Sequence, residues 1–126
     1  FFPIKNKKYS RNHLLLISLI FHLKGAISIS DIKLVLEKVN EKIVKEDFDA
    51  EKLYTSFLTL VDQNVHQFKS QFQELVSGAQ EEVKHFDEKD ADYIEKVLLI
   101  SSLSYMSHVY RRAAEKLVDQ IQQSEE

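Results

Sequence analysis

The stretch from Val61 to Phe86 reads VDQNVHQFKSQFQELVSGAQEEVKHF. Its apolar side chains return at alternating spacings of four and three residues, and no proline interrupts them. Such a heptad register places one face of a helix against another helix. Asp49 can cap this helix at its start, and Glu82 is the one break in the register. We therefore predict a long helix whose dimer seam is formed by Val61, Val65, Phe68, Phe72 and Leu75.

A second long helix is predicted after a polar corner at residues 87–90. Apolar residues from Ile94 to Ile121 recur at helical spacing and give that helix a broad apolar face. Two long helices joined by a short corner are expected to form an antiparallel hairpin. Each helix then keeps apolar surface that a single chain of 126 residues does not cover. This surplus favours a homodimer.

Two shorter helices are predicted before the hairpin. Ser10 can cap a helix from about Arg11 to Lys24, and Gly25 would end it as a left-handed residue. Ser28-Ile29-Ser30-Asp31 forms a capping box, which predicts a second helix that starts at Ile29. A connector is expected near residues 45–49.

The composition favours an all-α protein. The chain has two glycines and one proline, and 44% of its residues are apolar. It has no cysteine, which excludes disulfides and thiolate metal sites and fits a reducing compartment, with the cytoplasm as the expected location. The longest apolar run, Leu14 to Phe21, is eight residues long, whereas a membrane span needs about 20. We expect no membrane partner.

Charge is distributed unevenly along the chain. The first 30 residues carry five basic side chains and no acidic one, whereas the rest of the chain carries twelve basic and twenty acidic side chains. Four of the five basic residues lie between Lys5 and Arg11, so the density of positive charge in this segment is high. This asymmetry indicates a polyanionic partner, most simply a nucleic acid, although a solvated basic terminus explains the charges equally well.

The N-terminal third resembles a known DNA-binding domain. Residues 8–14 read KYSRNHL and are followed by an apolar helix, Gly25 and the segment SISDIKLVL at residues 28–36. In order and spacing these segments resemble the second half of a MerR-type winged-helix domain, and more closely the YkrK-like bacterial family of unknown function. The resemblance implies two parts: residues 1–48 as the C-terminal half of that domain, and residues 49–126 as a helical hairpin for dimerisation or effector binding.

The resemblance implies contacts with double-stranded DNA. Lys7, Lys8 and Tyr9 occupy positions of the family's wing, Arg11 follows them, and Lys5 belongs to the same basic cluster. Such side chains contact phosphates without reading sequence. Asn6 departs from the family pattern, which usually has a turn glycine there. The chain begins at Phe1 and would lack the major-groove helix, so we expect a piece of a longer protein that by itself binds DNA weakly or not at all.

Other functions find less support in the sequence. The five histidines are scattered, and no glycine-rich loop could cradle a phosphate, so we expect no enzyme, no metal site and no cofactor. An aromatic stripe that includes Phe57, Phe68, Tyr105 and Tyr110 fits either plain core or the pocket of an unidentified small-molecule effector. An all-helical interaction module that does not bind DNA is the alternative to a transcriptional regulator.

Overall fold

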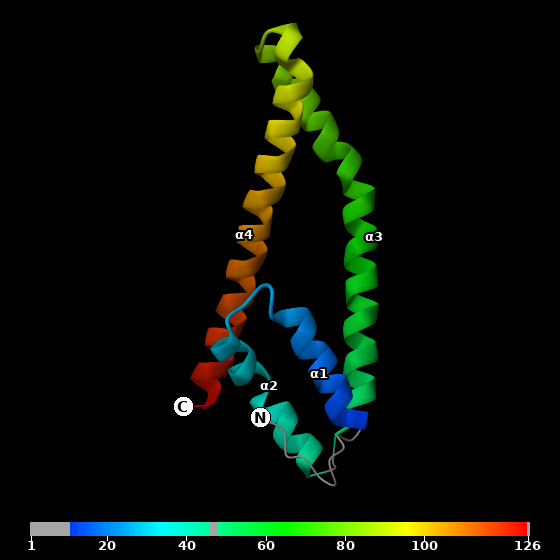
Figure 1. Cartoon of the computed structure of the whole chain (residues 1–126), viewed down its shortest axis with the longest axis vertical. Coiled ribbons are helices and arrows are strands. Elements are labelled where there is room, and N and C mark those ends of the chain that lie inside the picture. The colour runs from blue at the N-terminus through cyan, green and yellow to red at the C-terminus, as the bar shows by residue number, and fades with distance from the viewer. Residues whose placement is uncertain (1–10, 46–47, 126) are drawn as a thin grey trace. The chain divides into compact units, whose positions relative to one another are not determined.

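The computed structural model of the chain describes residues 11–45 and 48–125 and is all-α (Figure 1). The helices are α1 (Arg11–Leu23), α2 (Ile29–Val44), α3 (Ala50–Glu82) and α4 (Ala91–Glu125). Two short 3-10 helices, η1 (Val83–His85) and η2 (Glu88–Asp90), connect α3 to α4. The predicted all-α class is confirmed. None of the helices in this described part holds a stretch long and apolar enough to cross a membrane.

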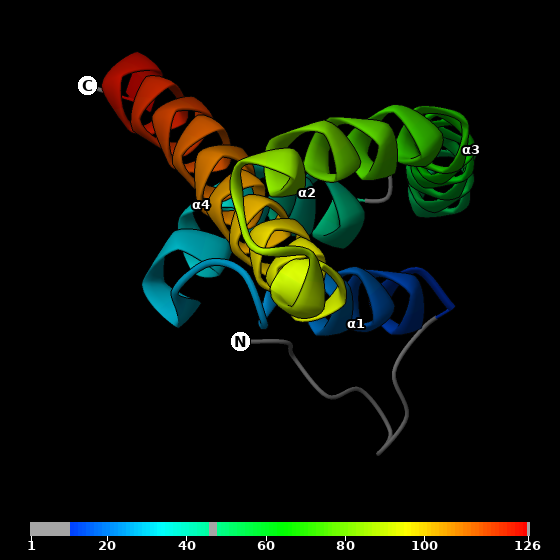
Figure 2. The same ribbon diagram turned by 90° about the horizontal axis from the view of Figure 1, so that it is seen from above.

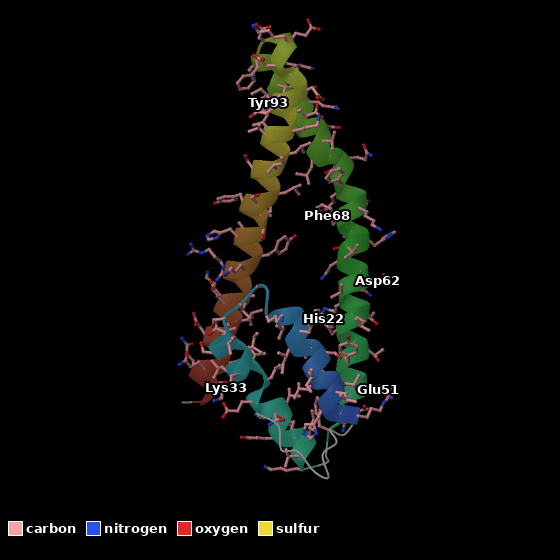
Figure 3. All side chains as sticks on the ribbon, in the orientation of Figure 1. His22, Lys33, Glu51, Asp62, Phe68 and Tyr93 are labelled. Atoms are coloured by element: carbon pink, nitrogen blue, oxygen red, sulfur yellow. The ribbon has the colours of Figure 1, made fainter. Side chains whose placement is uncertain are left out.

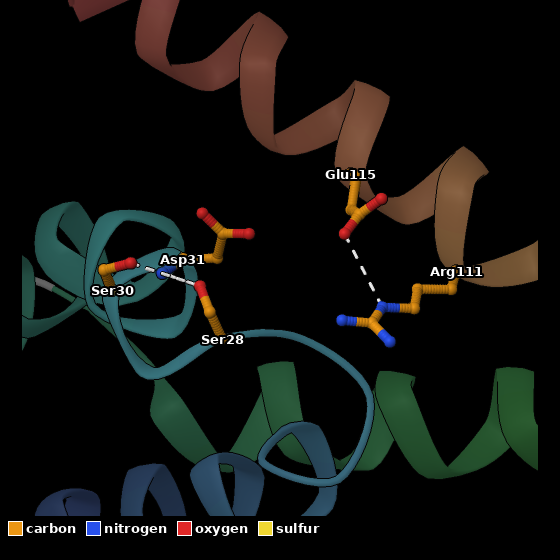
Figure 4. Close-up of polar contacts among 5 residues, drawn as sticks. All are labelled: Ser28, Ser30, Asp31, Arg111 and Glu115. Carbon is orange, nitrogen blue, oxygen red and sulfur yellow. Dashed lines mark hydrogen bonds and ion pairs between the residues drawn. The ribbon is translucent and has the colours of Figure 1, made fainter.

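Two helices begin at residues that the sequence predicts as caps. Ser28 precedes α2, and its hydroxyl accepts a hydrogen bond from the backbone N–H of Asp31 at 3.1 Å (Figure 4). Asp49 precedes α3, and its Oδ1 accepts a hydrogen bond from the backbone N–H of Lys52 at 3.0 Å. Each side chain satisfies a first-turn donor that has no partner within its helix. Both predicted caps are confirmed, whereas Ser10 lies outside the described residues.

The turn after α1 differs from its prediction. Gly25 does not adopt a positive φ, so the expectation of a left-handed residue there is wrong. Instead, the N–H groups of Ala26 and Ile27 both donate to the carbonyl oxygen of Leu23, at 3.0 and 3.2 Å. These bonds satisfy a carbonyl group at the helix end while the backbone keeps an ordinary conformation. The turn does not depend on glycine, because a Cβ at position 25 would meet no atom within 4 Å.

The described residues form two compact units, of which the first combines those up to Thr59 with those from Arg111 onward. Within this unit α1 and α2 lie side by side (Figure 2). Apolar residues recur at helical spacing on α1 and α2, so their side chains meet in a common core. The core residues are at most 9% exposed and are Leu16, Leu19, Ile27, Ile32, Leu36, Ile43 and Ala50.

The second unit, Leu60–Tyr110, contains most of α3, the corner formed by η1 and η2, and the first part of α4. Its buried side chains lie near the corner, where Ala79 and Val83 are each 8% exposed. Away from the corner, every residue from Leu60 to Gln71 is exposed, as is every residue from Ser104 to Tyr110. The second unit therefore covers its apolar surface only at the corner.

Candidate interaction surfaces

Most of the residues predicted to contact DNA phosphates lie outside the described part of the chain. Lys5, Lys7, Lys8 and Tyr9 belong to residues 1–10, whereas Arg11 is the first residue of α1. The Nε of Arg11 lies 3.4 Å from Oε2 of Glu51, which Figure 3 labels at the start of α3. The two side chains are 74% and 61% exposed, so their ion pair contributes little to stability. The Arg11 guanidinium is thus open to solvent and accessible to an anion.

The predicted dimer seam forms one stripe along α3. Val61, Val65 and Phe68 are 39%, 46% and 45% exposed, and Phe72 and Leu75 are half-buried. The rings of Phe68 and Phe72 lie 5.7 Å apart between centroids. Towards the corner the same stripe continues into Ala79 and Val83, which are buried. The five predicted residues therefore share one helix face, and that face is uncovered in the part farthest from the corner.

An uncharged segment of α4 is the second uncovered surface. Residues 97–110 read VLLISSLSYMSHVY and contain no Asp, Glu, Lys or Arg. Ile100, Tyr105, Met106 and Tyr110 are 64%, 68%, 41% and 72% exposed. A helix that is apolar on most sides is normally buried in a globular protein. The broad apolar face was predicted from the sequence, but the absence of charge over fourteen residues is the more specific signal of a binding surface.

A hollow of about 450 Å³ lies between α3 and α4 near the corner. It is lined by Glu74, Leu75, Gly78, Ala79 and Glu82 of α3 and by Leu98, Leu99 and Ser102 of α4. The aromatic residues that the sequence suggested for an effector pocket are not among these lining residues. Phe57 belongs to the first unit, and Phe68, Tyr105 and Tyr110 are exposed elsewhere in the second. The hollow is therefore mainly aliphatic, with two carboxylates.

Phe57 instead joins an aromatic cluster between α1 and the start of α3. The Nε2 of His22 lies 3.3 Å from the hydroxyl of Tyr54, and the His22 ring lies 5.3 Å from that of Phe57. The ring of Phe21 contacts that of His22 edge-on, with 6.1 Å between the ring centroids, and Lys24 Nζ lies 5.2 Å from the centre of the Phe21 ring. This cluster connects two helices of the first unit. No spacing pattern predicts this cluster, because His22 and Tyr54 are 32 residues apart.

Charged side chains stand at both ends of the uncharged segment of α4. Before it, Lys96 Nζ donates a hydrogen bond to Asp92 at 2.7 Å, which raises the pKa of Lys96. After it, Arg111 Nε lies 3.6 Å from Glu115 Oε2 (Figure 4). Each of these basic side chains thus has an acidic partner one turn away on its own helix.

Across residues 11–45 and 48–125, no group of three His, Cys, Asp or Glu side chains could hold a metal ion.

The N-terminal part of the chain matches a known protein family. Residues 1–57 match the family described as Domain of unknown function (DUF1836). This segment includes α1, α2 and the first residues of α3, and it ends just before the second unit begins at Leu60. No curated protein and no solved structure matches the chain. The family description states neither a ligand nor an activity, so the resemblance to MerR-type and YkrK-like proteins stays a prediction.

Proposed function

We propose that the chain is part of a cytoplasmic transcriptional regulator, in which the N-terminal segment contacts DNA phosphates and the second unit forms a homodimer. The distribution of charge is the observation that carries this proposal. The first 30 residues contain five basic side chains and no acidic one, while the rest of the chain is acidic overall. A dense positive segment binds the phosphate backbone and releases its counterions. The contacts would come from Lys5, Lys7, Lys8, Tyr9 and Arg11.

The position of Arg11 supports the proposal. Arg11 starts α1, and its guanidinium is accessible while it pairs with Glu51. An exposed ion pair is weak, so a phosphate can replace the carboxylate at little cost. Guanidinium and phosphate also form charge-assisted hydrogen bonds, which are stronger than those between neutral groups. Arg11 can therefore extend the basic cluster onto α1.

A salt titration of DNA binding tests the phosphate contacts. The 126-residue chain would be titrated against a fluorescent duplex in dilute buffer, with anisotropy as the readout. Four basic contacts predict a slope of about −3.6 for the logarithm of the binding constant against the logarithm of salt concentration. The triple variant Lys7→Ala, Lys8→Ala, Arg11→Ala should reduce that slope to about −0.9.

A matched variant separates these contacts from net charge. Substituting Lys84, Lys89 and Lys96 by Ala removes the same number of positive charges from the second unit. This control should keep the original slope. A slope that stays unchanged in the N-terminal variant, or that falls equally in both variants, would show that the assigned residues do not contact phosphate.

The second candidate is an interaction module that does not bind DNA. The exposed apolar faces of α3 and α4 favour it, because soluble proteins seldom leave large contiguous apolar patches uncovered. Such a module would associate with a protein partner and ignore duplex DNA even in dilute buffer. The same titration on the full-length regulator distinguishes the two candidates, because the chain by itself is expected to bind DNA weakly or not at all.

A further inference from the structure

The hollow of about 450 Å³ near the corner lies wholly within the second unit. Four aliphatic side chains form most of its floor: Leu75 and Ala79 come from α3, and Leu98 and Leu99 come from α4. Pockets that hold small organic molecules have volumes of roughly 300 to 1,000 Å³ and mostly apolar linings. The size and the lining therefore suit the apolar part of a small molecule.

Gly78 opens the hollow on the α3 side. Glu74, Gly78 and Glu82 follow one another at intervals of four residues and so lie along one row of the helix surface. A Cβ at position 78 would meet no atom within 4 Å, so the space beside the glycine backbone is open. The Cα atoms of the two glutamates are about 12 Å apart at 1.5 Å per residue, and position 78 puts no side chain between them.

The polar side chains that line the hollow can all accept hydrogen bonds. Within the part of the chain that the structure describes, neither Glu74 nor Glu82 pairs with a basic side chain. Ser102 adds a hydroxyl from the α4 side. The lining contains no lysine, arginine or histidine. A molecule that complements this lining therefore supplies the positive charge and the hydrogen-bond donors.

The surroundings of the hollow are negatively charged as well. Residues 60–110 contain nine acidic and four basic side chains, not counting histidine. Two of the four basic side chains already have acidic partners, since Lys84 pairs with Glu81 and Lys96 pairs with Asp92. An excess of one charge raises the local concentration of ligands of the opposite charge. The second unit therefore attracts organic cations and repels organic anions.

We infer that this hollow binds a small organic cation that has an apolar body and one protonated amine. The apolar body rests on the aliphatic floor, and the ammonium group lies beside Gly78. Because the Cα–Cβ bonds of a helix tilt towards its N-terminus, the side chain of Glu82 extends towards position 78 and within reach of that group. The site goes beyond the proposed function, because binding requires neither DNA nor a second copy of the chain.

Three ligands with the same apolar body test the charge requirement. At neutral pH diphenylpropylamine is a cation, diphenylpropanol is neutral and diphenylpropionate is an anion. Isothermal titration calorimetry with the 126-residue chain would measure their affinities. One carboxylate about 4 Å from a cation in a watery environment favours binding about fivefold, so the amine should bind at least about fivefold more tightly than the alcohol. The anion should bind more weakly than either. Equal affinities of amine and alcohol, or no binding of the amine at millimolar concentration, would overturn the inference.

Neutral variants of the two glutamates test the position of the amine. Glu82→Gln and Glu74→Gln together should lower the affinity for the amine by about tenfold or more and leave the affinity for the alcohol unchanged. Glu88→Gln is the matched control, because it removes a negative charge from the same unit outside the hollow. It should change the affinity for the amine by less than about twofold. If Glu88→Gln weakened binding as much as Glu82→Gln alone, the amine would be responding only to net charge.

Gly78→Leu tests the location of the ligand without changing any charge. The space beside Gly78 is open, so a leucine side chain there projects into the hollow and occupies the place of the ligand. This variant should lose binding of both the amine and the alcohol. Ser77→Leu adds the same side chain at an exposed neighbouring position outside the hollow and should keep binding. Circular dichroism would verify that both variants fold.

Retained binding in Gly78→Leu, or equal loss in both leucine variants, would contradict the assigned site. Either result would leave the proposed phosphate contacts untouched, because their salt titration contains no organic cation.

Discussion

Substitution of Leu16 by Ala would measure how strongly the first unit is held together. Leu16 is 2% exposed and lies in the core that α1 shares with α2 and Ala50. The change removes three carbon atoms, worth about 2.4 kcal/mol of transfer free energy at about 0.8 kcal/mol each. The cavity left behind adds to this loss, and buried Leu→Ala changes cost about 2 to 5 kcal/mol. We expect the free energy of unfolding of the first unit to fall by about 3 kcal/mol.

Hydrogen exchange followed by mass spectrometry would detect this loss. A fall of about 3 kcal/mol should speed the exchange of α2 peptides by roughly 100-fold under conditions in which exchange follows the opening equilibrium. The control is Leu14→Ala, the same change two residues earlier on α1. Leu14 is 53% exposed, so this substitution should cost less than about 1 kcal/mol. Equal effects of the two substitutions would refute the assignment of the buried face of α1.

Two further substitutions test local features. Ser28→Ala removes the acceptor for the Asp31 N–H and should lower the stability of the first unit by about 1 kcal/mol in urea denaturation, whereas Ser30→Ala should have a smaller effect; equal losses would contradict the cap. Gly78→Ala should stabilise α3 by about 0.5 to 1 kcal/mol and raise the melting temperature, because a Cβ there meets no atom within 4 Å; a lower melting temperature would show that Gly78 is needed for a close contact.

Features decided by local chemistry could be predicted from the sequence. Ser28 and Asp49 cap α2 and α3 because a short polar side chain next to a helix start finds a free N–H within a few residues. Gly25 shows the limit of such reasoning. Glycine permits a positive φ but does not require one, and here two hydrogen bonds to Leu23 close the turn without it.

Contacts between residues that are far apart in the sequence could be predicted less well. The heptad spacing from Val61 to Leu75 predicted which face of α3 is apolar. It contained no information on what covers that face, so it did not predict that the stripe is buried at the corner and uncovered at Val61, Val65 and Phe68. The contact between His22 and Tyr54 was missed for a similar reason, because no spacing rule links residues so far apart in the chain.

Because residues 97–110 contain no Asp, Glu, Lys or Arg, salt concentration should act differently on this segment and on the basic N-terminal segment. Salt strengthens an apolar contact or leaves it unchanged. The affinity of lysine and arginine side chains for nucleic acid phosphates, in contrast, falls steeply as the salt concentration rises. Under the proposed function, a rise in salt concentration would therefore release the chain from DNA and leave an apolar contact between two copies in place.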